Sequence, residues 1–301
     1  MEHRAGYAAI LGLPNAGKST LMNAILGQKL SITTSKPQTT RKSILGILSE
    51  EDYQIVFLDT PGILEPGYLL QQKMMDFVMN SIKDADVLLL LIDMENDFTG
   101  EKLFYNEVVK EVLNKKEKQI MFVLNKIDKA NEQKLVDMTN KLNQIGYEMI
   151  IPVSAQLKVN TKTVVEEIIK YLPEHPKYFP DDIVSSENER FFVSEIIREK
   201  IFELYSEEIP YSTEVVVIEY KERENNKDFI QAEIYIERNS QKGIIIGKNG
   251  ETIKKLGSLA RKDIEEFLGK EVFLDIRVKV KEKWRNNENL LKSFGYISDS
   301  E

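Results

Sequence analysis

An eight-residue segment near the start of the chain has the residue types and spacing of a phosphate-binding loop. The segment Gly12-Leu13-Pro14-Asn15-Ala16-Gly17-Lys18-Ser19 fits G-x-x-x-x-G-K-[ST] and is followed by Thr20. Its two glycines let the backbone curl so that successive N–H groups point at a phosphate, and a following helix adds its dipole. We expect these nine residues to hold a nucleoside triphosphate, with Lys18 on the β- and γ-phosphates and the Ser19 hydroxyl on Mg²⁺.

Three shorter motifs, each directly after an apolar segment, predict which nucleotide binds. Asp59-Thr60-Pro61-Gly62 offers a carboxylate that can hold Mg²⁺ through water and a glycine N–H for the γ-phosphate. Asn125-Lys126-Ile127-Asp128 offers a carboxylate that can accept hydrogen bonds from guanine N1–H and the 2-amino group, which adenine lacks. Ser154-Ala155 can present a backbone N–H to guanine O6. Each motif alone is weak, but their order at strand ends predicts a site for GTP or GDP.

A second glycine-containing loop, Gly247-Lys248-Asn249-Gly250, follows the apolar residues 244–246. The pattern G-x-x-G is weak by itself. Here it lies between two predicted helices, after two predicted strands and before a third, which is the KH arrangement with the strand order of the type II form. Missing side chains let backbone N–H groups approach phosphates, and flanking isoleucines can floor a groove for unstacked bases. We therefore expect single-stranded RNA to bind here.

Basic residues surround this second loop in a chain that is acidic overall. The chain has 41 lysines and arginines against 49 aspartates and glutamates, a net charge of -8. Residues 238–262 nevertheless contain seven basic side chains against one acidic, and residues 277–285 contain five against one. A solvated helix or strand face is the alternative explanation for such a pattern. The predicted RNA-binding residues are Lys242, Gly247, Lys248, Asn249, Gly250, Lys254, Lys255, Arg277 and Lys279.

The composition excludes several other kinds of chemistry. There is no cysteine, so disulfides, thiolate zinc sites and cysteine nucleophiles are excluded, and with only two histidines Ser-His-Asp chemistry is not expected. The longest apolar run, residues 87–92, is far shorter than the roughly 20 residues of a membrane-spanning helix, and the first residues do not read as a signal peptide. With 42% hydrophobic residues the chain can build real cores, so we expect a soluble cytoplasmic protein of two domains.

Short apolar segments alternate with longer amphipathic ones in the first 170 residues. The alternation predicts an α/β domain whose mostly parallel six-stranded sheet has helices on both faces. The predicted strands are Tyr7–Leu11, Ile44–Leu48, Gln54–Leu58, Val87–Ile92, Ile120–Leu124 and Met149–Val153. The predicted helices are Lys18–Leu26, Leu69–Lys83, Glu101–Asn114, Glu132–Ile145 and Thr161–Tyr171. Only five residues separate the second strand from the third, which predicts an antiparallel hairpin at one sheet edge.

A segment with three prolines and no helix or strand period marks the expected domain boundary. We predict a nucleotide-binding domain over 1–172, a linker over 173–187 and an α+β RNA-binding domain with a tail over 188–301. The predicted order in the last part is helix (Glu189–Tyr205), strand (Thr213–Glu222), strand (Phe229–Glu237), short helix, helix (Gly250–Leu268) and strand (Val272–Val280).

The first 170 residues resemble translation-factor-type small GTPases. Lys36-Pro-Gln-Thr39-Thr40-Arg41 matches the switch I element of the Era-like branch of that class. The resemblance implies that Thr40 joins Ser19 and, through water, Asp59 on Mg²⁺. It also implies that Asn15 occupies the position used as a monovalent-cation ligand in potassium-activated members, and that Lys18, Thr40, Gly62 and Asn15 form the catalytic set. Ile63 stands where Ras-like enzymes have the glutamine that orients water, so hydrolysis should be slow or assisted by another group or by K⁺.

Both domains together, with Tyr178-Phe-Pro and the C-terminal Trp284…Phe294-Gly295-Tyr296, are similar to the Era family of bacterial GTPases along nearly the whole chain. That resemblance implies binding to the 3′ end of 16S ribosomal RNA, assistance in maturation of the small (30S) ribosomal subunit, and peripheral contact with the membrane. We also expect a monomer. Trp284 either stacks on a base or anchors the tail.

Two alternatives share the first domain. A tRNA-modification GTPase would pair it with a larger helical domain and cysteine chemistry, and cysteine is absent here. A membrane-linked signalling GTPase would use the basic C-terminal part on anionic lipid, for which charge suffices without a glycine loop.

Overall fold

Six apolar segments between Arg4 and Val153 pair into one sheet in the computed structural model, which describes residues 3–224 and 226–297. The strand order is β2-β3-β1-β4-β5-β6. Neighbouring strands are parallel except for β2 and β3, which form the antiparallel hairpin expected at the sheet edge. The strands are β1 (Arg4–Gly12), β2 (Ile44–Ser49), β3 (Tyr53–Asp59), β4 (Val87–Asp93), β5 (Gln119–Asn125) and β6 (Ile150–Val153). The predicted fold class of this part is therefore confirmed.

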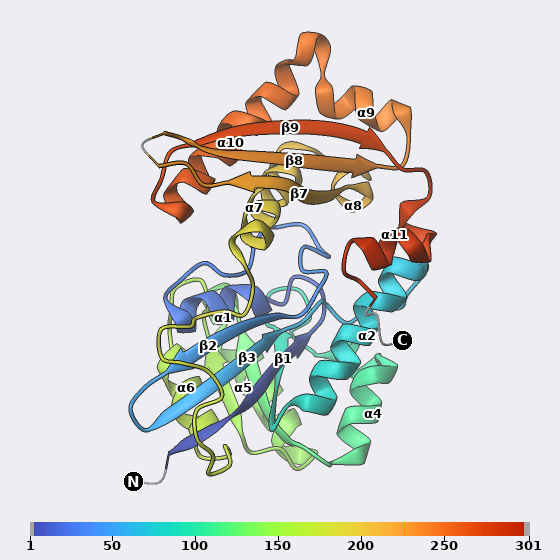
Figure 1. The fold of residues 1–301 in the computed structure, drawn as a ribbon. Coiled ribbons are helices and arrows are strands. Elements are labelled where there is room, and N and C mark those ends of the chain that lie inside the picture. The colour runs from blue at the N-terminus through green and yellow to red at the C-terminus, as the bar shows by residue number, and fades with distance from the viewer. Residues whose placement is uncertain (1–2, 225, 298–301) are drawn as a thin grey trace. The chain divides into compact units, whose positions relative to one another are not determined.

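Helices lie on both faces of this sheet (Figure 1). This explains why the central strands are continuous apolar runs: every residue of β4 is buried. On one face α1 packs against α6. The helices of this part are α1 (Lys18–Leu26), α2 (Leu69–Asp84), α3 (Glu101–Tyr105), α4 (Glu107–Lys115), α5 (Glu132–Gln144) and α6 (Thr161–Ile169).

The single helix expected over Glu101–Asn114 is two helices, and that prediction was wrong. The chain leaves helical conformation at Asn106, whose side chain accepts a hydrogen bond from the backbone N–H of Val108. Asparagine is a preferred residue at the start of a helix because its side-chain oxygen satisfies an otherwise unpaired N–H group. The periodicity of the apolar residues continues across the break, which is why the pattern alone did not reveal it.

The proline-containing segment after α6 belongs to the first of two compact units. That unit comprises Met1–Pro66 and Met74–Ser186, and the second comprises Gly67–Lys73 and Glu187–Glu301. The backbone N–H of Ala5 donates to Pro173 O (3.2 Å) and that of Ile47 donates to Val184 O (2.9 Å). The unit boundary thus falls at the end of the predicted linker, which itself lies along the first sheet. Predictions for residues 1–2, 225 and 298–301 fall outside the described residues.

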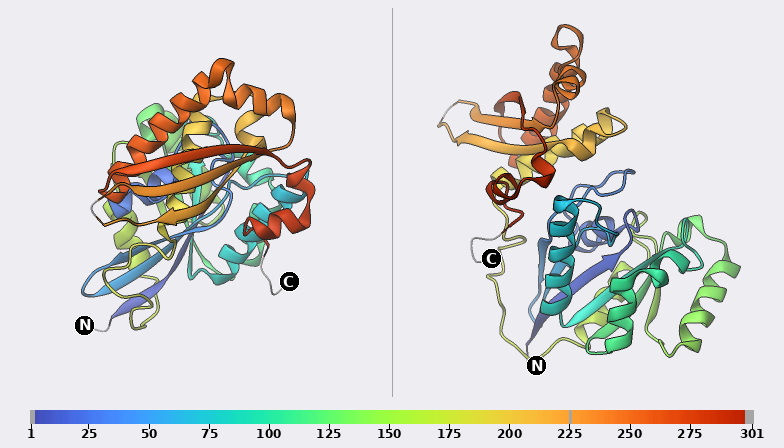
Figure 2. Two further views of the ribbon diagram at one scale, coloured as in Figure 1. Left: turned by 45° about the horizontal axis from the view of Figure 1, so that its top comes forward. Right: turned by 90° about the vertical axis from the view of Figure 1, so that its right-hand side faces the viewer.

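The second unit has a three-stranded sheet in the order β7-β8-β9. Strands β7 and β8 are antiparallel and β8 and β9 are parallel, so the type II KH arrangement is confirmed. Two long helices, α7 and α10, pack against each other and against the sheet (Figure 2). The elements are α7 (Glu189–Leu204), α8 (Ile209–Ser212), β7 (Glu214–Lys221), β8 (Asp228–Ile236), α9 (Asn239–Ile246), α10 (Glu251–Leu268), β9 (Val272–Val280) and α11 (Glu288–Ser293).

The C-terminal segment is anchored to the second unit by buried polar contacts. Trp284 is fully buried, and its Nε1 donates to Ser212 O at 2.8 Å. The Tyr296 hydroxyl donates to Glu214 Oε2, also at 2.8 Å. Of the two roles considered for Trp284, anchoring is the one observed, because a fully buried indole has no exposed face for a base.

None of the helices in residues 3–224 and 226–297 combines the length and apolar character needed to span a bilayer.

Candidate nucleotide site and RNA-binding groove

The carboxyl ends of the parallel strands bring all four nucleotide motifs to one edge of the first sheet. The first loop curls between β1 and α1 and lines a cavity of about 320 Å³. Gly17 has a φ of 91°, and a Cβ added there would lie only 2.2 Å from Asn125 Nδ2, so this position requires glycine. The Lys18 ammonium is buried and donates to Gly12 O (3.1 Å) and Leu13 O (3.0 Å). A cation is thus held inside a curl of backbone, as a phosphate site requires.

Oxygen atoms suited to Mg²⁺ meet beside this lysine. Ser19 Oγ donates to Asp59 Oδ2 at 2.6 Å and lies 2.9 Å from Thr40 Oγ1. Asp59 Oδ1 is buried and accepts no hydrogen bond from the described residues. Within that part of the chain no cluster of three or more histidines, cysteines or carboxylates could hold a metal alone. One carboxylate with two hydroxyls fits Mg²⁺, which usually takes its remaining oxygens from phosphates and water.

Burial perturbs the two charged groups at the centre of the site. Burial lowers the pKa of Lys18 to about 8, against the opposing effect of the Asp59 carboxylate. Burial raises the pKa of Asp59, while the Ser19 hydrogen bond and the Lys18 charge act in the opposite direction. Desolvated charges of this kind interact strongly with an incoming charged ligand because water no longer screens them. A triphosphate with Mg²⁺ supplies both an anion for Lys18 and a cation for Asp59.

The loop after β3 passes directly over the first loop. A Cβ added to Gly62 would lie 2.7 Å from Pro14 Cα, so only glycine allows this approach. The backbone N–H of Ile63 donates to Gly12 O at 3.0 Å, and the Ile63 side chain is buried. The residue at the position of the Ras-like glutamine is therefore part of the core. Thr60, also buried, donates from its hydroxyl to Ile10 O at 2.6 Å and stabilises the turn.

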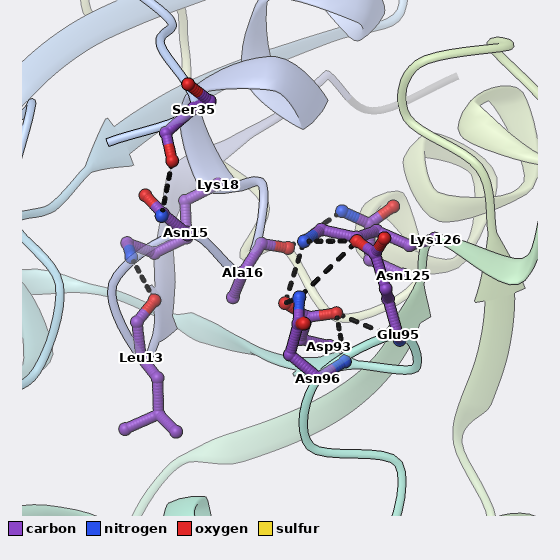
Figure 3. Close-up of polar contacts among 10 residues, drawn as sticks. All are labelled: Leu13, Asn15, Ala16, Lys18, Ser35, Asp93, Glu95, Asn96, Asn125 and Lys126. Atoms are coloured by element: carbon purple, nitrogen blue, oxygen red, sulfur yellow. Dashed lines mark hydrogen bonds and ion pairs between the residues drawn. The ribbon is translucent and has the colours of Figure 1, made fainter. Parts of the chain in front are cut away.

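Asn15 connects the first loop, of which it is part, to the segment that contains Thr40. Its Nδ2 donates to the backbone oxygen of Ser35 at 2.9 Å (Figure 3). An amide oxygen beside backbone carbonyls is the type of environment that a hard monovalent cation accepts. Asn15 thus lines the larger cavity, and its role as a cation ligand stays a prediction.

The two remaining motifs form a second cavity of about 210 Å³, next to the first. Asn125 connects three loops: its Nδ2 donates to Ala16 O (2.8 Å) and its Oδ1 accepts from the Ala155 N–H (3.1 Å). Ser154 Oγ donates to Asp128 Oδ1 at 2.6 Å, which orients this carboxylate toward the cavity it lines. Eleven of the eighteen predicted nucleotide-site residues thus line one or both of these adjoining cavities.

The loop after β4 also contributes to the site, although no sequence motif predicted it. Lys126 Nζ contacts Asp93 Oδ2 (2.7 Å) and Glu95 Oε2 (3.2 Å), and Glu95 and Asn96 line the larger cavity (Figure 3). Burial by itself would raise the pKa of Asp93, but hydrogen bonds from Asn96 and Lys126 outweigh it and lower the pKa. The sequence contained one signal for this loop. Asp93 directly follows the apolar run 87–92, just as Asp59 follows the apolar strand before it.

The second glycine loop connects α9 to α10. Gly247 and Gly250 have φ values of 72° and 76°, and a Cβ at Gly247 would lie 2.0 Å from Thr252 Oγ1. Lys248 and Asn249 between them are exposed. Because Gly250 directly precedes α10, the unpaired N–H groups of that helix start beside the loop.

A groove of about 360 Å³ lies between α10 and β9, and most of its lining was not predicted. One wall carries basic side chains and the other is apolar, a combination that suits phosphates on one side and unstacked bases on the other. The lining residues are Ile253, Lys254, Gly257, Ser258 and Arg261 of α10 and Phe273, Leu274 and Ile276 of β9. Lys254 is the only predicted RNA residue among them; Lys255 is exposed on α10 and Lys242 lies on α9.

Arg277 and Lys279 do not line this groove. Along β9 the alternate residues Val278 and Val280 pack into the core, so Arg277 and Lys279 point to the opposite face of the sheet. Each has a carboxylate partner there, Asp275 at 3.0 Å and Glu233 at 2.5 Å respectively. Their contribution to RNA binding stays a prediction, and the structure separates them from the other predicted residues.

Two family models match parts of this chain. The model of the 50S ribosome-binding GTPase family matches residues 7–126, and the KH domain model matches residues 208–285. GTPase Era of Alkaliphilus metalliredigens is 44% identical, covering 98% of this chain and 100% of that protein. The chloroplastic GTPase ERA1 of Zea mays is 48% identical over 98% of this chain and 71% of that protein.

Two solved structures share the whole architecture. A variant of Era from Aquifex aeolicus bound to GDP and AlF4⁻ superimposes with a TM-score of 0.91 at 37% identity, covering 98% of this chain and all of that one. An Era complex with MgGDPNP and nucleotides 1506–1542 of 16S ribosomal RNA gives a TM-score of 0.90 at 36% identity, with the same coverage. Because identity of this level extends over both units, the shared features are those of one family. The chain belongs to the Era family of GTPases.

Proposed function

We propose that this GTPase is a switch that binds single-stranded RNA near the 3′ end of 16S ribosomal RNA and assists assembly of the small ribosomal subunit. GTP or GDP occupies the two adjoining cavities of the first unit, with the base beside Asp128 and the phosphates around Lys18. Mg²⁺ is held by Ser19 and Thr40 and through water by Asp59, and when bound it supplies positive charge to the phosphate oxygens. The relative bound to MgGDPNP and a 16S fragment supports both halves of the proposal.

The hydrolytic part rests on what the chain's own residues do around the phosphates. Lys18 places a buried positive charge where negative charge develops. Gly62 carries its N–H close to the first loop because its missing side chain permits the contact with Pro14. We propose K⁺ beside Asn15 as a further source of charge, since the buried Ile63 can neither orient water nor neutralise an anion.

The groove between α10 and β9 carries the RNA half of the proposal. It has a basic wall at Lys254 and Arg261 and an apolar wall at Leu274 and Ile276. Apolar side chains of such a groove can pack against unstacked bases, and the phosphates of the strand can pass the glycine loop. Peripheral membrane contact and a monomeric state remain parts of the proposal that stand on resemblance alone.

Fluorescence anisotropy with an oligonucleotide of the 16S 3′ end tests this function directly. The protein is loaded with GDP or with a non-hydrolysable GTP analogue, and each form is titrated at two salt concentrations. We expect tighter binding in the GTP-analogue form and affinity that falls as salt rises, because phosphate contacts release counterions. Binding to anionic vesicles without binding to the oligonucleotide would instead favour the membrane-linked alternative.

A further inference from the structure

The two cavities of the nucleotide site meet at four residues. Gly17, Thr20, Glu95 and Lys126 line both the cavity of the phosphate loop and the cavity of Asp128. In a nucleotide the ribose joins the base to the phosphates. A nucleotide with its base in one cavity and its phosphates in the other must therefore have its ribose at this junction.

The Glu95 carboxylate is held at the junction by one of its two oxygens. Oε2 receives Lys126 Nζ at 3.2 Å and Asn96 Nδ2 at 3.4 Å (Figure 3). Oε1 accepts no hydrogen bond within the part of the chain that the structure describes, and the side chain is 45% exposed. Glu95 therefore keeps one acceptor oxygen available on the wall that the ribose passes.

The backbone of this loop is fixed by the carboxylate at the end of β4. Asp93 Oδ1 accepts hydrogen bonds from the N–H groups of Glu95 (2.9 Å) and Asn96 (3.1 Å). Asp93 Oδ2 accepts from Asn96 Nδ2 (3.0 Å) and contacts Lys126 Nζ (2.7 Å). Glu95 is thus presented by a rigid turn, and a pre-positioned acceptor loses little entropy when a ligand binds.

We propose that Glu95 accepts hydrogen bonds from the ribose hydroxyls and makes the site select ribonucleotides over 2′-deoxyribonucleotides. The 2′ and 3′ hydroxyls are neighbouring donors, and a carboxylate is the strongest acceptor that a side chain offers them. Among the other junction residues, Gly17 has no side chain, Lys126 has no acceptor, and Thr20 offers a neutral hydroxyl, which is a weaker acceptor than a carboxylate. The proposal deepens the GTP site proposed above and depends on it.

The simpler role for Glu95 is to orient Lys126 without touching the ligand. In that case replacing Glu95 weakens every guanine nucleotide by the same factor, whatever its sugar. Direct contact with the 2′ hydroxyl predicts instead that the loss is confined to nucleotides that carry this group. The ratio of the two affinities therefore separates a contact from a positioning role.

The experiment measures the affinities of GDP and 2′-deoxy-GDP by calorimetry on full-length protein with Mg²⁺. We expect the wild type to favour GDP by about tenfold, the usual loss when a donor to a charged acceptor is removed. In Glu95→Ala the GDP affinity should fall to near that of 2′-deoxy-GDP, with the latter almost unchanged. Glu95→Gln, which keeps an acceptor oxygen, should retain part of the preference. Glu51→Ala, an exposed acidic residue of the β2–β3 turn, is the matched control and should leave the ratio unchanged.

Two outcomes would overturn the proposal: no preference between the sugars in the wild type, or an unchanged ratio in Glu95→Ala. Failure of the GTP site itself has a different signature. Asp128→Asn would then leave GDP affinity intact, whereas a wrong assignment of Glu95 leaves the Asp128 result untouched.

Discussion

The two binding regions of this chain are built in different ways. Apart from the segment with Thr40 between α1 and β2, the groups of the nucleotide site are on loops at the carboxyl ends of parallel strands, and these loops are connected by side chains such as Asn125. The RNA groove instead combines one glycine loop with the exposed faces of α10 and β9. The first region is fixed by short motifs, and the second is a surface whose residues are spread along two elements.

That difference determines what a change in each region should do. A nucleotide-site residue has a single polar role in a small cavity, so its loss leaves a buried group unpaired at high cost. A groove residue shares contact with a flexible strand, so its loss is partly compensated by neighbours. We therefore expect the effects of substitutions to decline from the first region to the second.

The largest effect is expected for Asp128→Asn. The new amide presents a donor to guanine's own donors, so GTP affinity should fall by roughly a thousandfold or more. Xanthosine triphosphate offers the complementary edge and should gain affinity. Competition calorimetry with GTP and xanthosine triphosphate measures the change in relative affinity. Asp137→Asn on α5, an exposed aspartate bound to Gln133, is the matched control and should behave like the wild type. Unchanged GTP binding in Asp128→Asn would contradict the assignment of this motif.

Replacing Lys248 and Asn249 together by Asp should give the next largest effect. Two carboxylates would repel phosphates beside the start of α10, so we expect RNA affinity to fall by about a hundredfold. Basal GTP hydrolysis should persist because the nucleotide site lies in the other unit. RNA affinity is measured by anisotropy with a 16S 3′-end oligonucleotide, and the rate of GTP hydrolysis is measured by a phosphate-release assay.

A second double variant tests whether RNA binds at the glycine loop or at the opposite face of the sheet. Arg277→Gln with Lys279→Gln removes two basic residues that already have carboxylate partners. We expect a loss of less than about threefold, since exposed paired charges contribute weakly. If this variant loses binding and the loop variant keeps it, the RNA contacts the open sheet face and the glycine loop is only a structural turn.

The same contrast explains what could be predicted from sequence. Motifs confined to four or eight residues located Lys18, Asp59 and Asp128, because strand ends of a parallel sheet converge whatever the details of packing. Periodicity located the strands of both sheets. It did not locate the groove wall at Leu274 and Ile276, since which face of β9 meets α10 depends on tertiary packing. Nor could it show that Arg277 and Lys279 face away, because a charge count along the chain does not distinguish the faces of a strand.

A smaller effect is expected at Gly257, a glycine inside α10 that helix propensity does not explain. A Cβ there would lie 3.8 Å from Ile276 Cδ1, an ordinary contact, so the backbone does not require glycine. Glycine is needed there instead to keep the groove open. Gly257→Leu should fill it and lower RNA affinity about tenfold while the unfolding temperature holds or rises, since leucine favours helix. Gly257→Ala should lose much less. Equal RNA binding by all three proteins would show that the groove is not the RNA site.

A modest effect is expected for the cation proposed beside Asn15. Ile63 is buried, so transition-state charge on the phosphates needs a source other than the usual glutamine. Asn15 is exposed and bound to Ser35 O, so an ion beside it would be weakly held. Loss of a rigid donor costs about a hundredfold in rate, and a weakly held ion should supply less, about fivefold. We expect turnover to be faster by this factor in K⁺ than in matched Na⁺ buffer, and Asn15→Ala to abolish the difference. Equal rates of the wild-type protein in both salts would remove the cation from the mechanism and leave Lys18 and Mg²⁺ as the sources of charge.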